Sequence, residues 1–150
     1  MRIDAALLCD AVTVRENLLH ILGGGITRIN RPQFPSPLGA ALAVRIMLHR
    51  TEVDRQHTIE VILAGEDGQM IAKVEAKFQV PAQTLMDLQP SEEVTVNLPL
   101  GLQGLLIPHA GAYAFDMLID NTHTASVPFH AVVMQAGHLP PQSPGTLLTS

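Results

Sequence analysis

Hydrophobic residues recur at every second position along much of this chain, and no other feature limits the possible folds as strongly. In the clearest stretch, 70–80, two sets of residues alternate: Met70, Ala72, Val74, Ala76, Phe78 and Val80 against Ile71, Lys73, Glu75, Lys77 and Gln79. A period of two sends successive side chains to opposite faces of a β-strand. A helix would instead mix lysines and apolar side chains on one face, so the stretch predicts a strand with one face in water.

The same alternation predicts about seven more strands. They are expected near 5–12, 18–29, 42–49, 58–64, 94–100, 113–119 and 126–133. Asp67-Gly68 lies between two alternating apolar runs, which is a strong hairpin signal. Asp120-Asn121-Thr122 predicts another turn. Gly23-Gly24-Gly25 predicts a bulge or a sharp bend within 18–29, because glycine adopts positive φ without steric cost.

About eight short strands predict an all-β fold, an antiparallel β-sandwich, with a closed barrel as the alternative. A sheet with one wet face also argues against a parallel α/β fold. The one helical turn expected is 82–88, between Pro81 and Pro90. We expect a single β-sandwich domain over 1–136. A flexible tail is expected over 137–150, which holds three prolines and no charged residue.

The composition limits the kinds of partner that this protein is expected to bind. Hydrophobic residues make up 47% of the chain and charged residues 15%, against a usual charged fraction of about 25%. So few charges leave apolar patches on the surface or between subunits, which predicts a homo-oligomer or a protein partner. The 9 basic and 14 acidic residues argue against binding to nucleic acid or to an anionic membrane surface.

The cysteine count and the first residues bear on the compartment. Cys9 is the only cysteine, which argues against a secreted domain held by disulfides. The apolar run between Asp4 and Asp10 has five residues, fewer than the roughly 7–15 of a secretory signal. Two long uncharged stretches, 94–115 and 121–150, are interrupted by prolines and polar residues, so neither is expected to span a membrane. We therefore expect a cytoplasmic protein.

One polar loop is a candidate binding site. Residues 51–57 lie between two predicted strands, and loops at the ends of sheets often carry binding residues. Glu52, Arg55 and His57 could form a small charged site in which Arg55 offers its planar fork to a carboxylate. The other interpretation, which we favour, is an internal salt-bridged turn that fixes the crossover between the two strands.

Other polar or reactive residues predict no chemistry. No two of the seven histidines have the spacing by which one strand or helix presents two metal ligands. The glycine run 23–25 lacks the Lys-Ser/Thr of a phosphate loop. Cys9 is expected beside Leu7 in the core, where a thiol keeps a high pKa and stays unreactive. We therefore predict no catalytic residue, no metal ligand and no cofactor.

The segment Pro108-His109-Ala110-Gly111-Ala112-Tyr113 has a specific structural meaning. A Pro-x-x-Gly-x-Tyr run before a late strand resembles the tyrosine corner of immunoglobulin-like sandwiches, in which the buried hydroxyl bonds the main chain just upstream. Gly111 and Tyr113 are thus expected to serve the fold and not a reaction.

Several of these segments together resemble a family of small bacterial proteins known as a domain of unknown function. The resemblance covers nearly the whole chain to about Val133 and rests on a set of motifs: Leu7-Leu8-Cys9-Asp10-Ala11, Ile21-Leu22-Gly23-Gly24-Gly25, Phe34-Pro35, Thr51-Glu52, Arg55, His57, Asp67-Gly68, Gly104, Pro108, Gly111, Tyr113, Phe115 and Asp120. It implies an immunoglobulin-like β-sandwich and no particular activity or ligand.

These observations leave three functions in view. The first is a non-enzymatic β-sandwich that acts through protein–protein contacts or self-association. The second is an enzyme that binds a small molecule or a metal through the loop of Glu52, Arg55 and His57. The third is a self-assembling structural subunit related to phage or secretion systems.

Overall fold

The computed structural model describes residues 1–134, which form an all-β fold. The strands are β1 (Arg2–Cys9), β2 (Ala11–Arg15), β3 (Leu18–Leu22), β4 (Arg28–Arg31), β5 (Ser36–Pro37), β6 (Ala41–Leu48), β7 (Gln56–Gly65), β8 (Met70–Gln79), β9 (Val94–Gly101), β10 (Leu106–Ile107), β11 (Gly111–Ile119) and β12 (Thr122–Val133). Two short 3-10 helices, η1 (Arg50–Glu52) and η2 (Ala82–Asp87), precede β7 and β9. The predicted all-β class is confirmed. The predicted tail over 137–150 lies outside the described residues.

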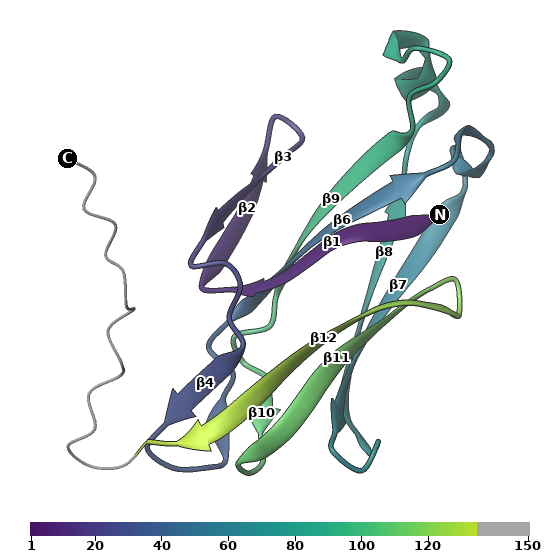
Figure 1. Ribbon diagram of the computed structural model, residues 1–150. Coiled ribbons are helices and arrows are strands. Elements are labelled where there is room, and N and C mark those ends of the chain that lie inside the picture. Colours follow the sequence, from purple (N-terminus) through teal and green to yellow (C-terminus); the bar gives the residue numbers. More distant parts are fainter. Residues whose placement is uncertain (135–150) are drawn as a thin grey trace, which may run out of the picture.

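Two larger sheets organise the chain (Figure 1). One has five strands in the order β4-β12-β11-β7-β8, antiparallel except where β4 runs parallel to β12. The other has three antiparallel strands in the order β1-β6-β9. Two small pairs, β2-β3 and β5-β10, complete the pattern. Strands adjacent in a sheet are often distant in the sequence, so the fold depends on long-range pairing.

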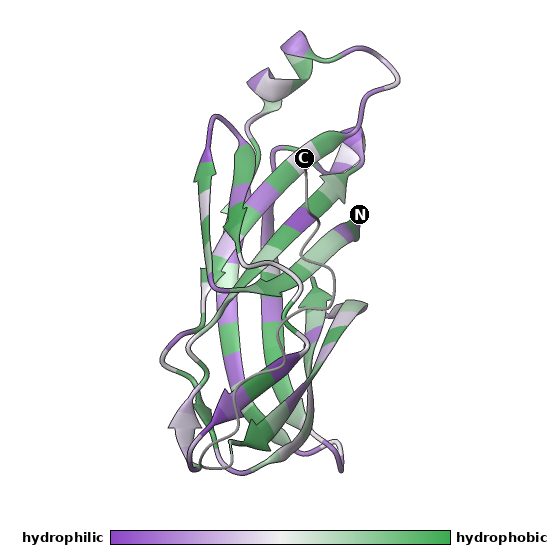
Figure 2. Ribbon diagram, turned by 60° about the vertical axis from the view of Figure 1, so that its left-hand side comes forward, coloured by the Kyte–Doolittle hydropathy of each residue, from purple (hydrophilic) through white to green (hydrophobic). Residues whose placement is uncertain are grey.

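The inward side chains of both larger sheets form one hydrophobic core. Leu42 and Ile46 of β6, Phe115 of β11 and Phe129 of β12 are almost fully buried in it. The rings of Phe115 and Phe129 lie 5.4 Å apart. Burial of each such side chain contributes roughly 1.5–3 kcal/mol. Figure 2 shows the alternating hydrophobic and hydrophilic bands along the strands that place these residues on one face.

The β2-β3 hairpin covers part of the outer face of the three-stranded sheet. Cys9, Ala41 and Ala43 point outward there and are still buried, because apolar side chains of the hairpin pack on them: Val12, Leu19 and Ile21. Their small size lets the hairpin approach the sheet. Cys9 is thus buried as expected, but it lies in this separate small cluster and not in the main core. Burial, and secondly the charge of Asp10, raises the pKa of its thiol.

Two predicted strands are each divided in the structure. The stretch 5–12 breaks at Asp10, whose amide donates to the main-chain oxygens of Leu22 and Gly23 at 3.0 and 3.3 Å. The stretch 18–29 breaks at Gly23-Gly24-Gly25, where Gly23 and Gly25 adopt φ of +61° and +89°. The segments on either side, β3 and β4, belong to different sheets. The glycines thus make a sharp bend between sheets, and not a bulge within one strand.

The short-range turns are where the sequence places them. The loop between β7 and β8 closes with Gly68 at φ +78° and its amide donating to the Gly65 oxygen at 2.9 Å. Asp67 Oδ1 accepts from the Gln69 amide at 3.0 Å. The helical turn expected over 82–88 is the 3-10 helix η2. Within residues 1–134, no helix has the length and apolar character needed to cross a bilayer.

Candidate functional site

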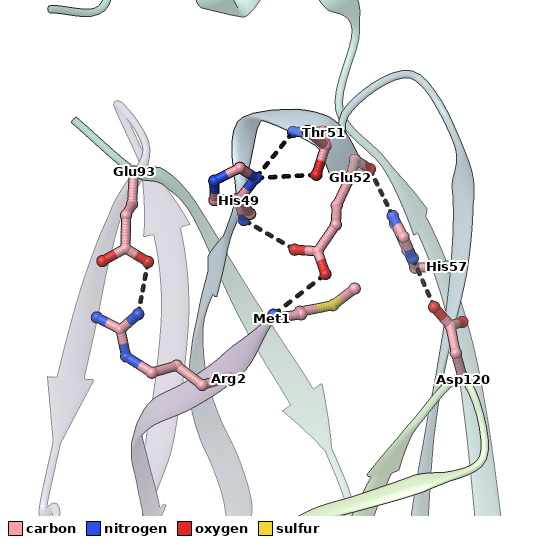
Figure 3. A network of polar contacts seen from close by, with 8 residues as sticks. All are labelled: Met1, Arg2, His49, Thr51, Glu52, His57, Glu93 and Asp120. Atoms are coloured by element: carbon pink, nitrogen blue, oxygen red, sulfur yellow. Dashed lines mark hydrogen bonds and ion pairs between the residues drawn. The ribbon is translucent and has the colours of Figure 1, made fainter. Parts of the chain in front are cut away.

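The polar loop 51–57 forms part of a hydrogen-bonded network at one end of the two larger sheets (Figure 3). Its first two residues, Thr51 and Glu52, belong to the helix η1, which begins after His49. The His49 amide donates to Glu52 Oε2 at 2.8 Å, and His49 Nδ1 accepts from the Thr51 amide at 3.3 Å. These reciprocal contacts are those of a capping box, which satisfies amides that a short helix leaves free.

His57 lies at the centre of the network. It is the second residue of β7, is only 3% exposed, and its ring lies against Phe78 of β8 at 5.4 Å. Nδ1 lies 2.7 Å from Asp120 Oδ2, and Nε2 lies 2.7 Å from the main-chain oxygen of Glu52. An ionised carboxylate and a carbonyl oxygen only accept hydrogen bonds. The ring therefore satisfies both partners when it carries a proton on each nitrogen and donates twice.

Asp120 joins this network from the turn between β11 and β12, 63 residues away from His57. The turn places Asp120 and Asn121 at φ of +49° and +68°, which Asp and Asn tolerate better than most residues. Its second carboxylate oxygen accepts from the Thr58 amide at 3.0 Å. Burial raises the pKa of Asp120, but the hydrogen bonds from His57 and Thr58 outweigh it and lower the pKa overall.

Glu52 contributes both its carboxylate and its main chain. One carboxylate oxygen accepts from the His49 amide, and the other lies 3.1 Å from the amino group of Met1, directly before β1. Burial raises the pKa of Glu52, whereas the contacts with His49 and Met1 lower it by more. The result is a pKa below the ordinary value. Both oxygens of this carboxylate are thus engaged within the protein.

Arg55 is the predicted site residue that the structure leaves apart. It is exposed, and within residues 1–134 its guanidinium makes no hydrogen bond or ion pair. Its charge only adds to the effects that lower the pKa of Asp120. The carboxylate that pairs with His57 is thus that of Asp120. The guanidinium of Arg55 does not pair with the carboxylate of Glu52. The sequence marked Asp120 as a turn residue and carried no local signal of its contact with His57.

The network connects four separate parts of the chain. It ties β1 through Met1, the loop before β7 through Glu52, and the turn after β11 through Asp120, while Arg2 pairs with Glu93 nearby (Figure 3). Each of its hydrogen bonds joins two groups of the protein itself. This arrangement is that of an internal polar clamp, which orders the loops at this end of the sheets. It agrees with the interpretation of the loop as a salt-bridged turn.

The opposite end of β11 has an open groove of about 700 Å³. Its floor includes Gly111 and Ala112, and its walls carry Arg28, Glu66 and His130. All three wall side chains are exposed. A groove this open, with solvated walls, binds a small ligand less readily than a concave pocket that buries most of the ligand.

Tyr113 is part of the main core. It is 4% exposed, and its hydroxyl donates to the main-chain oxygen of His109 at 2.6 Å. That is the hydrogen bond of a tyrosine corner. Gly111, which lies between His109 and Tyr113 in the sequence, adopts φ of +154°. The motif thus ties the loop before β11 to the sheet.

Comparison with known proteins places the chain in a family. A family model described as a family of unknown function (DUF6941) matches residues 4–132. The chain belongs to DUF6941. The match covers β1 to nearly the end of β12, as the shared motifs predict, and the resemblance to a family of unknown function is confirmed. No curated protein matches the chain. Membership in DUF6941 therefore assigns no activity, and function has to be argued from the structure.

Proposed function

We propose that this protein is a non-enzymatic contact module that pairs its edge strand β8 with a strand of another polypeptide. One observation carries the proposal: β8 is a ten-residue strand at the end of the five-stranded sheet, and it pairs only with β7. Its other side therefore presents main-chain donors and acceptors that no strand of residues 1–134 uses. Such an edge is a template for pairing with a further chain.

The other edges of the two larger sheets are less suited to pairing. The edge strand β4 has four residues, and β1 is irregular between Ile3 and Ala5. The edge strand β9 contains Pro99, which lacks an amide hydrogen. The hairpin also reaches β9, where the Asn97 side chain donates to the Asn17 oxygen at 2.6 Å. Short length, bulges, proline and coverage are the usual means by which edges avoid pairing.

The pairing edge of β8 is regular over most of its length. Its register with β7 shifts only near Ile71, and from Ala72 to Gln79 each residue has a partner in β7. No proline interrupts this segment. Val74 and Phe78 on its core-facing side are only half-buried, so an added strand would cover more of their apolar surface. The edge therefore offers both hydrogen bonds and apolar area.

The alternative function, an enzyme built on Glu52, Arg55 and His57, receives less support from the geometry. Both ring nitrogens of His57 and both carboxylate oxygens of Glu52 are engaged within the protein. A reaction at these groups would first have to break contacts that order the loop. We also propose the cytoplasm as the compartment, since the single Cys9 needs no oxidising environment.

A peptide with the sequence of residues 73–79 and blocked ends tests whether the edge accepts a strand. We expect it to slow amide hydrogen exchange in Ala72–Gln79 of the full chain and leave the exposed hairpin β2-β3 unchanged. A scrambled peptide of the same composition is the control. At a protein concentration at which the chain is monomeric, unchanged exchange in Ala72–Gln79 at the highest soluble concentration of the peptide would contradict the proposal. This experiment does not require the protein to associate with itself.

A further inference from the structure

We propose that the strand that pairs with β8 is β8 of a second copy, in antiparallel orientation and with the two Ala76 residues opposite each other. This inference rests on the proposed function and adds the partner and the register. The two copies would join their five-stranded sheets into one continuous sheet, related by a twofold axis. An interface of this kind is self-complementary, so every contact occurs twice.

The alternation along β8 limits the possible registers. Lys73, Glu75 and Lys77 are exposed on one face, and Val74 and Phe78 are half-buried on the other. A shift by one residue places water-facing side chains of one copy beside core-facing side chains of the other. Only registers centred on a residue, in which equal faces lie together, keep the apolar side chains over the cores of both copies.

Charge then selects among these registers. A pair centred on Glu75 would set the two Glu75 side chains opposite each other and each Lys73 opposite a Lys77. Like charges directly opposite each other destabilise a strand pair. A pair centred on Ala76 sets Glu75 opposite Lys77 of the second copy, twice. The order Lys-x-Glu-x-Lys thus makes the edge complementary to itself when the centre of the pair moves from Glu75 to Ala76, which shifts the pairing by two residues.

A register centred on Val74 would also pair opposite charges, Lys73 with Glu75, but two observations disfavour it. The amino group of Lys73 already lies 3.2 Å from Glu60 Oε2 of β7. The irregularity near Ile71 would also fall inside that longer interface. The register centred on Ala76 uses Lys73 to Gln79 only, which lies within the regular part of β8.

The core-facing side supports the same register. Val74 of one copy falls opposite Phe78 of the other, and small Ala76 side chains meet at the axis. Pairs of a β-branched and an aromatic residue are favourable across antiparallel strands. The ring of Phe78 already lies against His57, so it is held in place before the second copy binds. The chain's low content of charged residues, 15%, fits a surface that is buried on association.

Two charge variants test the register. In the Ala76-centred pair, Glu75→Lys sets the introduced lysine against Lys77, and Lys77→Glu sets the introduced glutamate against Glu75. Each variant alone should dimerise at least about tenfold more weakly than the unmodified protein in sedimentation velocity, because two favourable charge pairs become repulsive. Mixed in equal amounts, the two should form a heterodimer, since both charge pairs are restored. Glu92→Lys, an equal charge change at an exposed loop residue, should dimerise like the unmodified protein.

Each other result overturns a defined part of the inference. A Lys77→Glu variant that still dimerises excludes the Ala76 register. An equal mixture of the two variants that stays monomeric, while the unmodified protein dimerises, excludes charge pairing at this edge. An unmodified protein that is monomeric at every concentration overturns self-pairing, and the exchange experiment with the peptide then shows separately whether the edge accepts a strand. Far-ultraviolet circular dichroism establishes that each variant is folded before its association is compared.

Discussion

The two ends of β11 are held by different chemistry. At its beginning, the neutral hydroxyl of Tyr113 donates to the main-chain oxygen of His109 at 2.6 Å. Directly after its end, the carboxylate of Asp120 lies 2.7 Å from His57 Nδ1 and accepts from the Thr58 amide at 3.0 Å. Both contacts tie a loop to the sheet. Only the second depends on ionised groups.

This difference separates the two ends by their response to pH. Burial raises the pKa of Tyr113, so its hydroxyl keeps its proton in acid and at neutral pH. The pKa of Asp120 is lowered overall, so its carboxylate stays ionised until the solution is strongly acid. The neutral end should therefore be insensitive to acid, and the ionic end should weaken. One strand is thus fastened by a neutral contact at its beginning and by an ionic contact after its end.

Removal of the His57 ring, at the centre of the network, should have the largest effect on the free energy of unfolding. His57→Leu leaves the Glu52 main-chain oxygen and Asp120 Oδ2 without their donor, and both contacts are partly buried. We expect a loss of about 2–4 kcal/mol in the free energy of unfolding, measured by urea denaturation. A loss below that of Tyr113→Phe would mean that the ionic end contributes less than the neutral one, and would reverse the comparison.

Loss of the Tyr113 contact at the neutral end should lower the free energy of unfolding by less. Tyr113→Phe removes one hydroxyl and leaves the His109 oxygen without its donor, while the ring keeps its stacked contact with Phe129 at 5.5 Å. We expect a loss of about 1–3 kcal/mol in the same denaturation experiment. An unchanged denaturation midpoint would reject the tyrosine corner as a stabilising feature.

The acid response of the ionic end can be measured with Asp120→Asn. Asn tolerates the positive φ at this position, so the turn should persist. At neutral pH we expect a loss of roughly 1 kcal/mol, since a charge-assisted bond becomes a neutral one. A lowered pKa in the folded state means that the carboxylate stabilises the fold above its unfolded pKa, near 3.8, and ceases to do so as the pH falls further.

The unmodified protein should therefore lose stability as the pH falls below that value, with an earlier contribution from Glu52 below about 4.5, its ordinary pKa. Asp120→Asn should show a shallower decline, and Tyr113→Phe should follow the profile of the unmodified protein at a lower level. Thermal denaturation between pH 2 and pH 7 measures all three. Parallel profiles for Asp120→Asn and the unmodified protein would remove Asp120 from the account of acid sensitivity.

The smallest change in the free energy of unfolding is expected for a substitution of Arg55, which the structure places outside the network. Arg55→Ala removes an exposed side chain that makes no ion pair within residues 1–134, so the free energy of unfolding should change by less than about 0.5 kcal/mol. Urea denaturation at low salt is the most sensitive test, because salt screens exposed charges. A loss comparable to that of Asp120→Asn would extend the network to Arg55.

Local features of the fold were predictable because adjacent residues encode them. The alternation in 70–80 predicted β8, and Asp67-Gly68 predicted the turn before it. The glycines at 23–25 predicted a bend, but not that the strands before and after it would join different sheets. Pairing partners depend on side chains that are distant in the sequence, so no local pattern states them.

The candidate site shows the same division. Glu52 and His57 were selected from one polar loop, and the structure brings them together through the main chain of Glu52. Asp120 and Met1, which complete the network, lie directly after β11 and directly before β1. Arg55 was selected because of its type and position, yet solvent surrounds it. A contact over 63 residues exists only once β7 and β11 are paired.

By itself, the sequence determined that this chain forms strands, where several of them turn, and which face of each is apolar, because the period of two and the turn residues act over a few positions. Only the tertiary structure decided which strand ends a sheet, what covers Cys9, and which carboxylate meets His57. The order of strands follows from the packing of the whole core, to which strands of both larger sheets contribute. The side of β8 that no strand of residues 1–134 pairs with is a consequence of that order, and the proposed function depends on it.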